Sequence, residues 1–141
     1  MEIKLNNWVK FLLVFICLVA SIGGFMIKLP SVFRGHDKEL HAAFYFLAAA
    51  FLNILFTNGR FTVHILIFAI LYFFSVGIEY AQEYSNKLLR KRIHGRYDPE
   101  DVKQNLKGLV AYSVLWITYR LAVLVYKKTT LKEATGNQDG H

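Results

Sequence analysis

The sequence has one cysteine, two prolines and few charged residues for its length. Because Cys17 is the only thiol among 141 residues, one chain can build neither a disulfide framework nor a cysteine-based metal site. Charged residues make up 19% of the chain and hydrophobic residues 55%, which excludes an ordinary soluble globule of this size. We therefore interpret the chain as a single-domain membrane protein.

Motifs of several soluble protein classes are also absent from the sequence. It has no glycine-rich phosphate loop, no Gly-x-Ser-x-Gly nucleophile elbow and no cysteine–histidine dyad with a usable thiol. The net charge of +7 could suggest nucleic acid, but the basic residues flank apolar runs and form no soluble basic module. We therefore predict membrane lipids, with anionic headgroups, as the partners and no nucleic acid.

Four long apolar runs dominate what is present. A helix rises about 1.5 Å per residue, and the hydrocarbon core of a bilayer is about 30 Å thick, so runs of this length can cross it. The pattern predicts an all-α membrane protein, a bundle of four transmembrane helices at about residues 8–29, 40–57, 61–82 and 105–126. Residues 1–126 are then one transmembrane domain, and the polar residues 127–141 are expected to form a disordered tail.

The first run is expected to stay in the membrane as a span. It carries no charge between Lys10 and Lys28 and lacks a convincing small-x-small cleavage site, which disfavours a signal peptide. A lipid anchor at Cys17 is not expected either, because the preceding Val-Phe-Ile lacks the small residue that a lipoprotein signal needs. We predict a multi-pass integral membrane protein.

The connections between the runs predict how the spans are arranged. Asn58-Gly59 favours a tight turn, because both residues readily adopt positive φ, so the second and third spans should form a close hairpin. In the long polar connection 83–104, Asp98 can cap the next helix and Pro99 suits its first position. Alternating spans place this connection and the one before residue 40 on the same side of the membrane.

Three groups of polar residues interrupt the lipid-compatible pattern on that side. They are Asp37, Lys38 and His41 at the start of the second span, Glu79 and Gln82 at the end of the third, and Arg96, Asp101 and Asn105 around the start of the fourth. Ionisable groups are costly near hydrocarbon, so this concentration indicates a function. Spacings of three and four residues place the members of a group on one helix face. We predict one polar pocket at the membrane interface.

Glu79, Asp101, His41 and Asp37 are the candidate catalytic residues. Glu79 follows an apolar stretch, where a carboxyl group can become a general acid or base. Asp37 lies one turn before His41 and could fix the tautomer of its ring. Structural alternatives remain open: an ion pair of Glu79 with a basic neighbour (Lys38 or Arg96), ordinary helix-start chemistry for the two aspartates, and an interfacial polar role for His41.

Lys38, Gln82, Arg96 and Asn105 are the candidate ligand-binding residues. The two cations suit phosphate or pyrophosphate, and the two amides could orient a ligand or bond across helices. Gly108 would allow close approach of another helix beside Asn105.

The histidine and the carboxylates offer nitrogen and oxygen ligands for a divalent metal. No dense ligand spacing such as His-x-x-x-His accompanies them, so we predict no metal site, and we name no cofactor. His36, His64 and His94 are assigned no role.

The ordered set of these residues resembles the VanZ-like family of small bacterial membrane proteins. The resemblance rests on Asp37-Lys38-x-x-His41 with Phe44, Glu79-x-x-Gln82, Arg96, and Asp101-x-x-x-Asn105-x-x-Gly108, and it covers about half of the chain. The stretch between Gln82 and Arg96 is longer and more basic than the compact turn of that family. Because the family name comes from a member associated with low-level teicoplanin resistance, the resemblance implies a cell-envelope context and about four membrane helices. It implies no particular reaction.

We therefore predict that the pocket binds or processes an anionic lipid or a lipid-linked envelope precursor, with an effect on glycopeptide susceptibility. Whether the protein is an enzyme stays open. The alternative is a non-enzymatic structural or assembly component whose polar residues form an interhelical network. An ion-coupled or proton-coupled transporter is disfavoured, since no ionisable residue lies near the mid-depth of a span.

Overall fold

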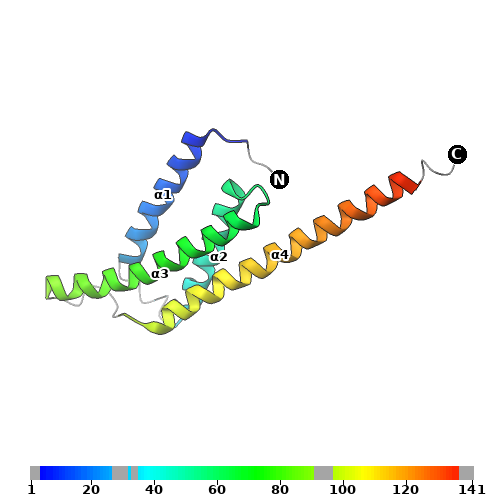
Figure 1. The fold of residues 1–141 in the computed structure, drawn as a ribbon. Coiled ribbons are helices and arrows are strands. Elements are labelled where there is room, and N and C mark those ends of the chain that lie inside the picture. Colours follow the sequence, from blue (N-terminus) through cyan, green and yellow to red (C-terminus); the bar gives the residue numbers. More distant parts are fainter. Residues whose placement is uncertain (1–3, 27–31, 33–34, 91–96, 137–141) are drawn as a thin grey trace.

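The computed structural model describes residues 4–26, 32, 35–90 and 97–136, and this part of the chain folds into four helices (Figure 1). They are α1 (Asn7–Met26), α2 (Asp37–Phe56), α3 (Phe61–Leu89) and α4 (Pro99–Gly136). Each is long and apolar enough to cross a membrane. The predicted all-α bundle of four transmembrane helices is confirmed, and the chain is a multi-pass membrane protein.

The third helix extends further than its apolar run. It continues to Leu89 instead of ending near residue 82, so much of the expected 83–104 loop is helical. Within this extension, Lys87 Nζ pairs with Glu83 Oε1 at 3.0 Å, one turn apart, which supports a solvated helical turn. Arg90 then adopts a left-handed conformation with φ of 47° and ends the helix.

The fourth helix begins as the sequence predicts, with Asp98 as its cap. The Glu100 backbone N–H donates to Asp98 Oδ1 at 2.8 Å, and Pro99 occupies the first helical position, where a missing N–H is harmless.

The far end of α4 differs from the expected disordered tail, because the helix continues through residue 126 to Gly136. The hydroxyls of Thr129 and Thr130 donate to carbonyls in the preceding turn, and the lysine, leucine, glutamate and alanine around them are good helix formers. Residues 127–136 are thus helical, a correction to the prediction; residues 137–141 lie outside the described part. Hydropathy predicted where the apolar surface stops and not where the backbone stops being helical.

Close contact between α2 and α4 organises the bundle. A Cβ atom at Gly108 would overlap the backbone carbonyl of Ala42, so only glycine allows this approach. The core formed there contains Tyr45, Ala49, Ile67, Leu71, Leu109 and Tyr112. The predicted close approach at Gly108 is therefore confirmed, and α4, not the hairpin partner α3, is the helix against which α2 packs most extensively.

The turn between α2 and α3 lies at the opposite end of the bundle from the polar groups. Asn58 and Gly59 have φ values of 44° and 73°, and the Arg60 N–H donates to the Thr57 carbonyl at 2.7 Å. Lys10, at the start of α1, donates to the Leu55 carbonyl at 2.8 Å. The start of α1 and the turn therefore share one side, as alternating spans require (Figure 1).

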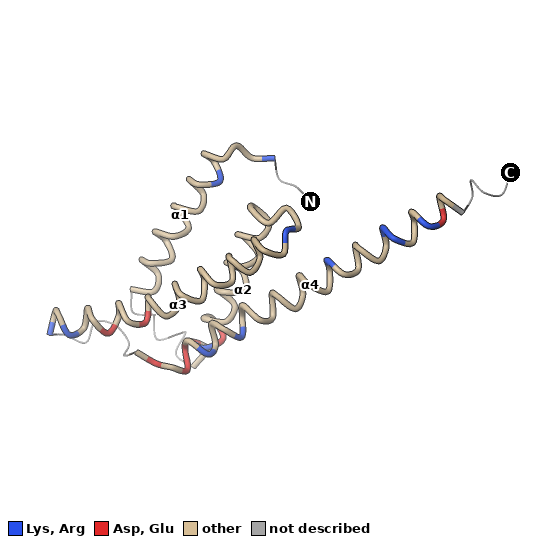
Figure 2. The backbone as a smooth tube through the Cα atoms, viewed as in Figure 1, with Lys and Arg blue, Asp and Glu red and all other residues tan. Residues whose placement is uncertain are grey.

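Polar and apolar side chains are distributed as in a protein surrounded by lipid. Among the described residues, the buried set contains as many polar side chains as apolar ones, while large aliphatic and aromatic residues cover the outside. Figure 2 shows long uncharged stretches in all four helices, with a basic residue about half-way along α4. Since lipid solvates apolar surface, helix association can rely on close packing and interhelical hydrogen bonds.

Candidate functional site

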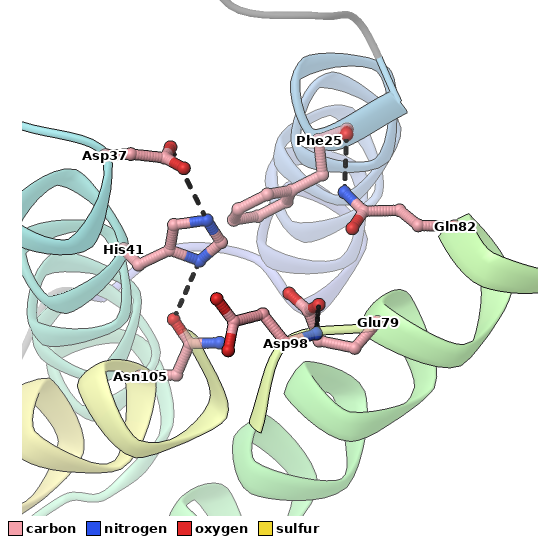
Figure 3. A network of polar contacts seen from close by, with 7 residues as sticks. All are labelled: Phe25, Asp37, His41, Glu79, Gln82, Asp98 and Asn105. Carbon is pink, nitrogen blue, oxygen red and sulfur yellow. Dashed lines mark hydrogen bonds and ion pairs between the residues drawn. The ribbon is translucent and has the colours of Figure 1, made fainter. Parts of the chain in front are cut away.

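The predicted polar groups of α2, α3 and α4 meet at one end of the bundle, beside the last turn of α1 (Figure 3). The sites of contact are the first turns of α2 and α4 and the segment of α3 around Glu79 and Gln82. The convergence predicted from alternating spans is therefore present among the described residues. Arg96 lies outside them.

His41 is the centre of a buried hydrogen-bond chain across three helices. Its Nδ1 lies 3.0 Å from Asn105 Oδ1, and Asn105 Nδ2 donates to Ser75 Oγ at 3.1 Å. Because the Asn105 amide presents its oxygen to the ring, His41 carries a proton on Nδ1 and donates it. Its other nitrogen, Nε2, faces Asp37 Oδ1 at 3.9 Å, which is too long for a hydrogen bond.

Glu79 is almost completely enclosed, with 1% of its surface exposed. Its Oε2 accepts a long bond of 3.5 Å from the Asp98 backbone N–H, at the cap of α4. Among the described residues Glu79 forms no ion pair with Lys38, so that structural alternative is not observed. The alternative pairing with Arg96 falls outside the described part of the chain.

Gln82 ties the end of α1 to the site. Its Nε2 donates to the Phe25 carbonyl at 2.8 Å, one of the terminal carbonyls that has no partner within its own helix. The Phe25 ring packs against His41, with ring centres 5.3 Å apart, and edge-on against Phe44 at 4.9 Å. Of the two roles considered for Gln82, the structure shows the bond across helices.

A cavity of about 490 Å³ adjoins the buried chain on the side of the helix starts. Asp37, Lys38, Asp98 and Asp101 line it together with Gln104 and other residues of the α2 start. Asp37, His41 and Asp101 each offer one ligand atom, and these atoms lie within 4.8 Å of one another. The three residues that could hold a cation thus lie at the inner edge of the cavity, where Asp37 and Asp101 of its lining meet the buried His41.

Tyr97 holds the segment before α4 against α3. Its ring stacks on Tyr80 with centres 4.9 Å apart, and Asp98 follows directly, with its N–H towards Glu79. No periodic pattern predicts this contact, because Tyr97 lies between helices.

A second buried polar network, towards the other end of the bundle, was not anticipated. His64 Nδ1 lies 2.8 Å from Asn53 Oδ1, and its Nε2 lies 3.1 Å from Ser113 Oγ. The ring also stacks on Trp116 at 4.2 Å, with planes 5° apart. The signal available in the sequence was a polar residue inside each of three apolar runs, Asn53, His64 and Ser113, and these can be matched only once the helices are placed beside each other.

Both networks contain a histidine, an asparagine and a serine contributed by three different helices. They differ at one atom, because both ring nitrogens of His64 have hydrogen-bond partners, whereas only Nδ1 of His41 has one among the described residues. In the His64 network both ring nitrogens are therefore satisfied by protein side chains. In the His41 network one ring nitrogen is left for a group in the cavity.

The chain matches no protein-family model, no curated protein and no solved structure. The resemblance to the VanZ-like family accordingly rests on the ordered residues themselves.

Proposed function

We propose that this protein is a VanZ-like component of a bacterial cell envelope whose interfacial cavity binds the phosphate-bearing headgroup of an anionic lipid or lipid-linked precursor. The observation that carries the proposal is a polar cavity at one end of the bundle, beside the starts of α2 and α4, lined by Lys38, Asp37 and Asp101 and backed by His41. In this position a lipid can keep its chains beside the apolar helices while its headgroup enters the cavity.

The contacts separate the candidate residues into two sets. The side-chain amides of Asn105 and Gln82 form hydrogen bonds to other helices, which supports a structural role for them. Lys38 and Asp101 line the cavity and form no side-chain ion pair among the described residues. The rim residues are therefore available to a ligand, and the deeper ones hold the rim in place.

A buried carboxyl next to the cavity lining supports a chemical step. Glu79 is enclosed and accepts the N–H of Asp98, which lines the cavity, so we infer that it exchanges a proton with a bound headgroup. Lys38 would contact the phosphate as a point charge.

Lipid binding is tested on the detergent-purified full chain by native mass spectrometry with a phosphatidylglycerol or a polyprenyl phosphate added. We expect a bound phospholipid that is retained preferentially over phosphatidylcholine and is weakened by Lys38→Gln. Lys103→Gln is the matched control, because Lys103 pairs with Glu100 on an exposed face away from the cavity lining. Equal retention of all lipids, or equal losses in both variants, would contradict the proposal.

A structural or assembly component is the second candidate, and the two interhelical networks favour it. In that case substitutions at the cavity rim change neither lipid retention nor teicoplanin susceptibility of a bacterium expressing the protein. Under the leading proposal, Lys38→Gln lowers lipid retention and removes any change in susceptibility, while the melting temperature stays the same.

A further inference from the structure

The unpartnered nitrogen of His41 points to a ligand other than a protein side chain. The ring is buried, with 8% of the residue exposed, and Asn105 accepts the Nδ1 proton. Nε2 then carries a lone pair, yet the group it faces is the Asp37 carboxylate at 3.9 Å, which is also an acceptor. Two acceptors directed at each other need a proton or a metal ion between them, and the 3.9 Å separation is longer than an N–H···O bond and leaves room for an ion.

The second histidine of the bundle provides an internal comparison. His64 is buried to a similar degree, and both of its nitrogens have partners within 3.1 Å. His41 Nε2, in contrast, has no hydrogen-bond partner among the described residues, so this atom is free to bind a ligand.

We infer that Asp37, His41 and Asp101 form a binding site for a divalent transition metal such as Zn²⁺ or Mn²⁺. Imidazole nitrogen and carboxylate oxygen both bind zinc, and carboxylate oxygen also suits manganese. Zinc bonds to such ligands are about 2.0 to 2.2 Å long, so two ligand atoms of a tetrahedral site lie about 3.4 Å apart. The Asp37–His41 separation is 3.9 Å and the full set lies within 4.8 Å, so rotation of the two carboxylates towards the ring would complete the site.

The surroundings of the three ligands resemble those of metal sites in general. The ring nitrogen that does not bind the metal donates to Asn105, which is itself held by Ser75. Such an outer hydrogen bond fixes the tautomer and the orientation of a ligating histidine. Phe25 covers the other face of the ring and keeps water from that side.

A metal here would also be accessible to a ligand in the cavity. Asp37 and Asp101 line it, so a coordination position left free by three protein ligands opens there. The cation would add positive charge to a lining in which Asp37, Asp98 and Asp101 outnumber Lys38, and would strengthen the binding of an anionic headgroup. This inference extends the proposed function but stands on the His41 geometry alone.

The test is equilibrium dialysis of the chelator-treated full chain in detergent against ZnCl₂, with the bound metal measured by mass spectrometry. We expect saturable binding of one zinc per chain, and an affinity loss of at least about tenfold in Asp37→Asn and Asp101→Asn, since even outer-shell changes cost about 10- to 100-fold. The matched controls are Glu133→Gln, an exposed acid of α4 outside the cavity lining, and His36→Gln, an exposed histidine; both should bind as the natural protein does.

Cobalt supplies a spectroscopic readout of the same site. Co²⁺ should give visible absorption bands that disappear in His41→Gln. Because His41 is buried and this variant could fail to fold, Asp37→Asn, whose side chain is about half exposed at 49%, decides the outcome, with its melting temperature in the absence of metal as the check on folding.

Absence of saturable zinc binding, or equal affinity in Asp37→Asn, Asp101→Asn and both controls, would overturn the metal site. Lipid retention that persists without zinc binding would remove this inference and leave the proposed function standing. Zinc binding without lipid retention would support the metal site and contradict the proposed lipid-binding function.

Discussion

Replacing Gly108 with alanine tests the contact that brings α2 and α4 together. The added methyl group would overlap the Ala42 carbonyl, and the Ala42 Cα lies 3.1 Å from its position. Both atoms belong to the backbone, so neither can rotate away. The two helices must separate, which also stretches the His41–Asn105 bond one turn along.

The size of the effect follows from three contributions. Forcing a methyl group into a packed interface costs typically about 1–3 kcal/mol. Losing a buried hydrogen bond and leaving its partners unpaired costs about 1–3 kcal/mol more. The better helix propensity of alanine offsets about 1 kcal/mol. We therefore expect Gly108→Ala to lower the free energy of unfolding by about 1–5 kcal/mol.

Gly77→Ala is the matched control for this variant. Gly77 lies in α3, and a Cβ atom there would meet nothing within 4 Å, so the substitution adds a methyl group without a clash. Reversible unfolding in mixed detergent micelles, followed by circular dichroism, measures both variants. Gly77→Ala should be as stable as the natural chain or slightly more stable. If Gly108→Ala unfolds at the same denaturant concentration as Gly77→Ala, the packing assigned to α2 and α4 is refuted.

Three further variants test the buried polar groups in the same unfolding assay. Tyr45→Phe should leave stability unchanged or raise it by up to about 1 kcal/mol, because the buried Tyr45 hydroxyl has no hydrogen-bond partner among the described residues; a clear loss would reveal a partner. Asn105→Leu should lower the free energy of unfolding by about 1–3 kcal/mol, since it leaves the His41 Nδ1 proton unpaired, and unchanged stability would show that this hydrogen bond does not stabilise the fold. Glu79→Gln should keep the melting temperature, because the amide oxygen can still accept the Asp98 N–H, while it abolishes any effect on teicoplanin susceptibility; full activity of this variant would exclude a catalytic carboxyl.

The sequence was most informative about features that one helix settles by itself. A run of apolar residues predicts a span, because a helix satisfies its own backbone hydrogen bonds in lipid. The Asn58-Gly59 turn and the Asp98 cap were also predictable, since their conformations depend on a few neighbouring residues. The ends of the helices were less predictable, because helices such as α3 continue past the apolar run with polar residues.

The candidate site could be located but not resolved from the sequence. Alternation of the spans was enough to bring Asp37, Glu79 and Asp101 to one side of the membrane. It could not separate Gln82, which bonds to the end of α1, from Lys38, which lines the cavity. Those roles depend on how each helix is rotated about its axis.

By itself, the sequence determined that this is a four-span membrane protein with its polar groups gathered on one side, because hydropathy and chain alternation are local and additive. Only the tertiary structure decided which of those groups form hydrogen bonds between helices. Close packing at Gly108 sets the distance between α2 and α4, and that distance brings His41 against Asn105 and leaves its second nitrogen facing Asp37. Such pairings are made between residues far apart in the chain, so no local pattern contains them.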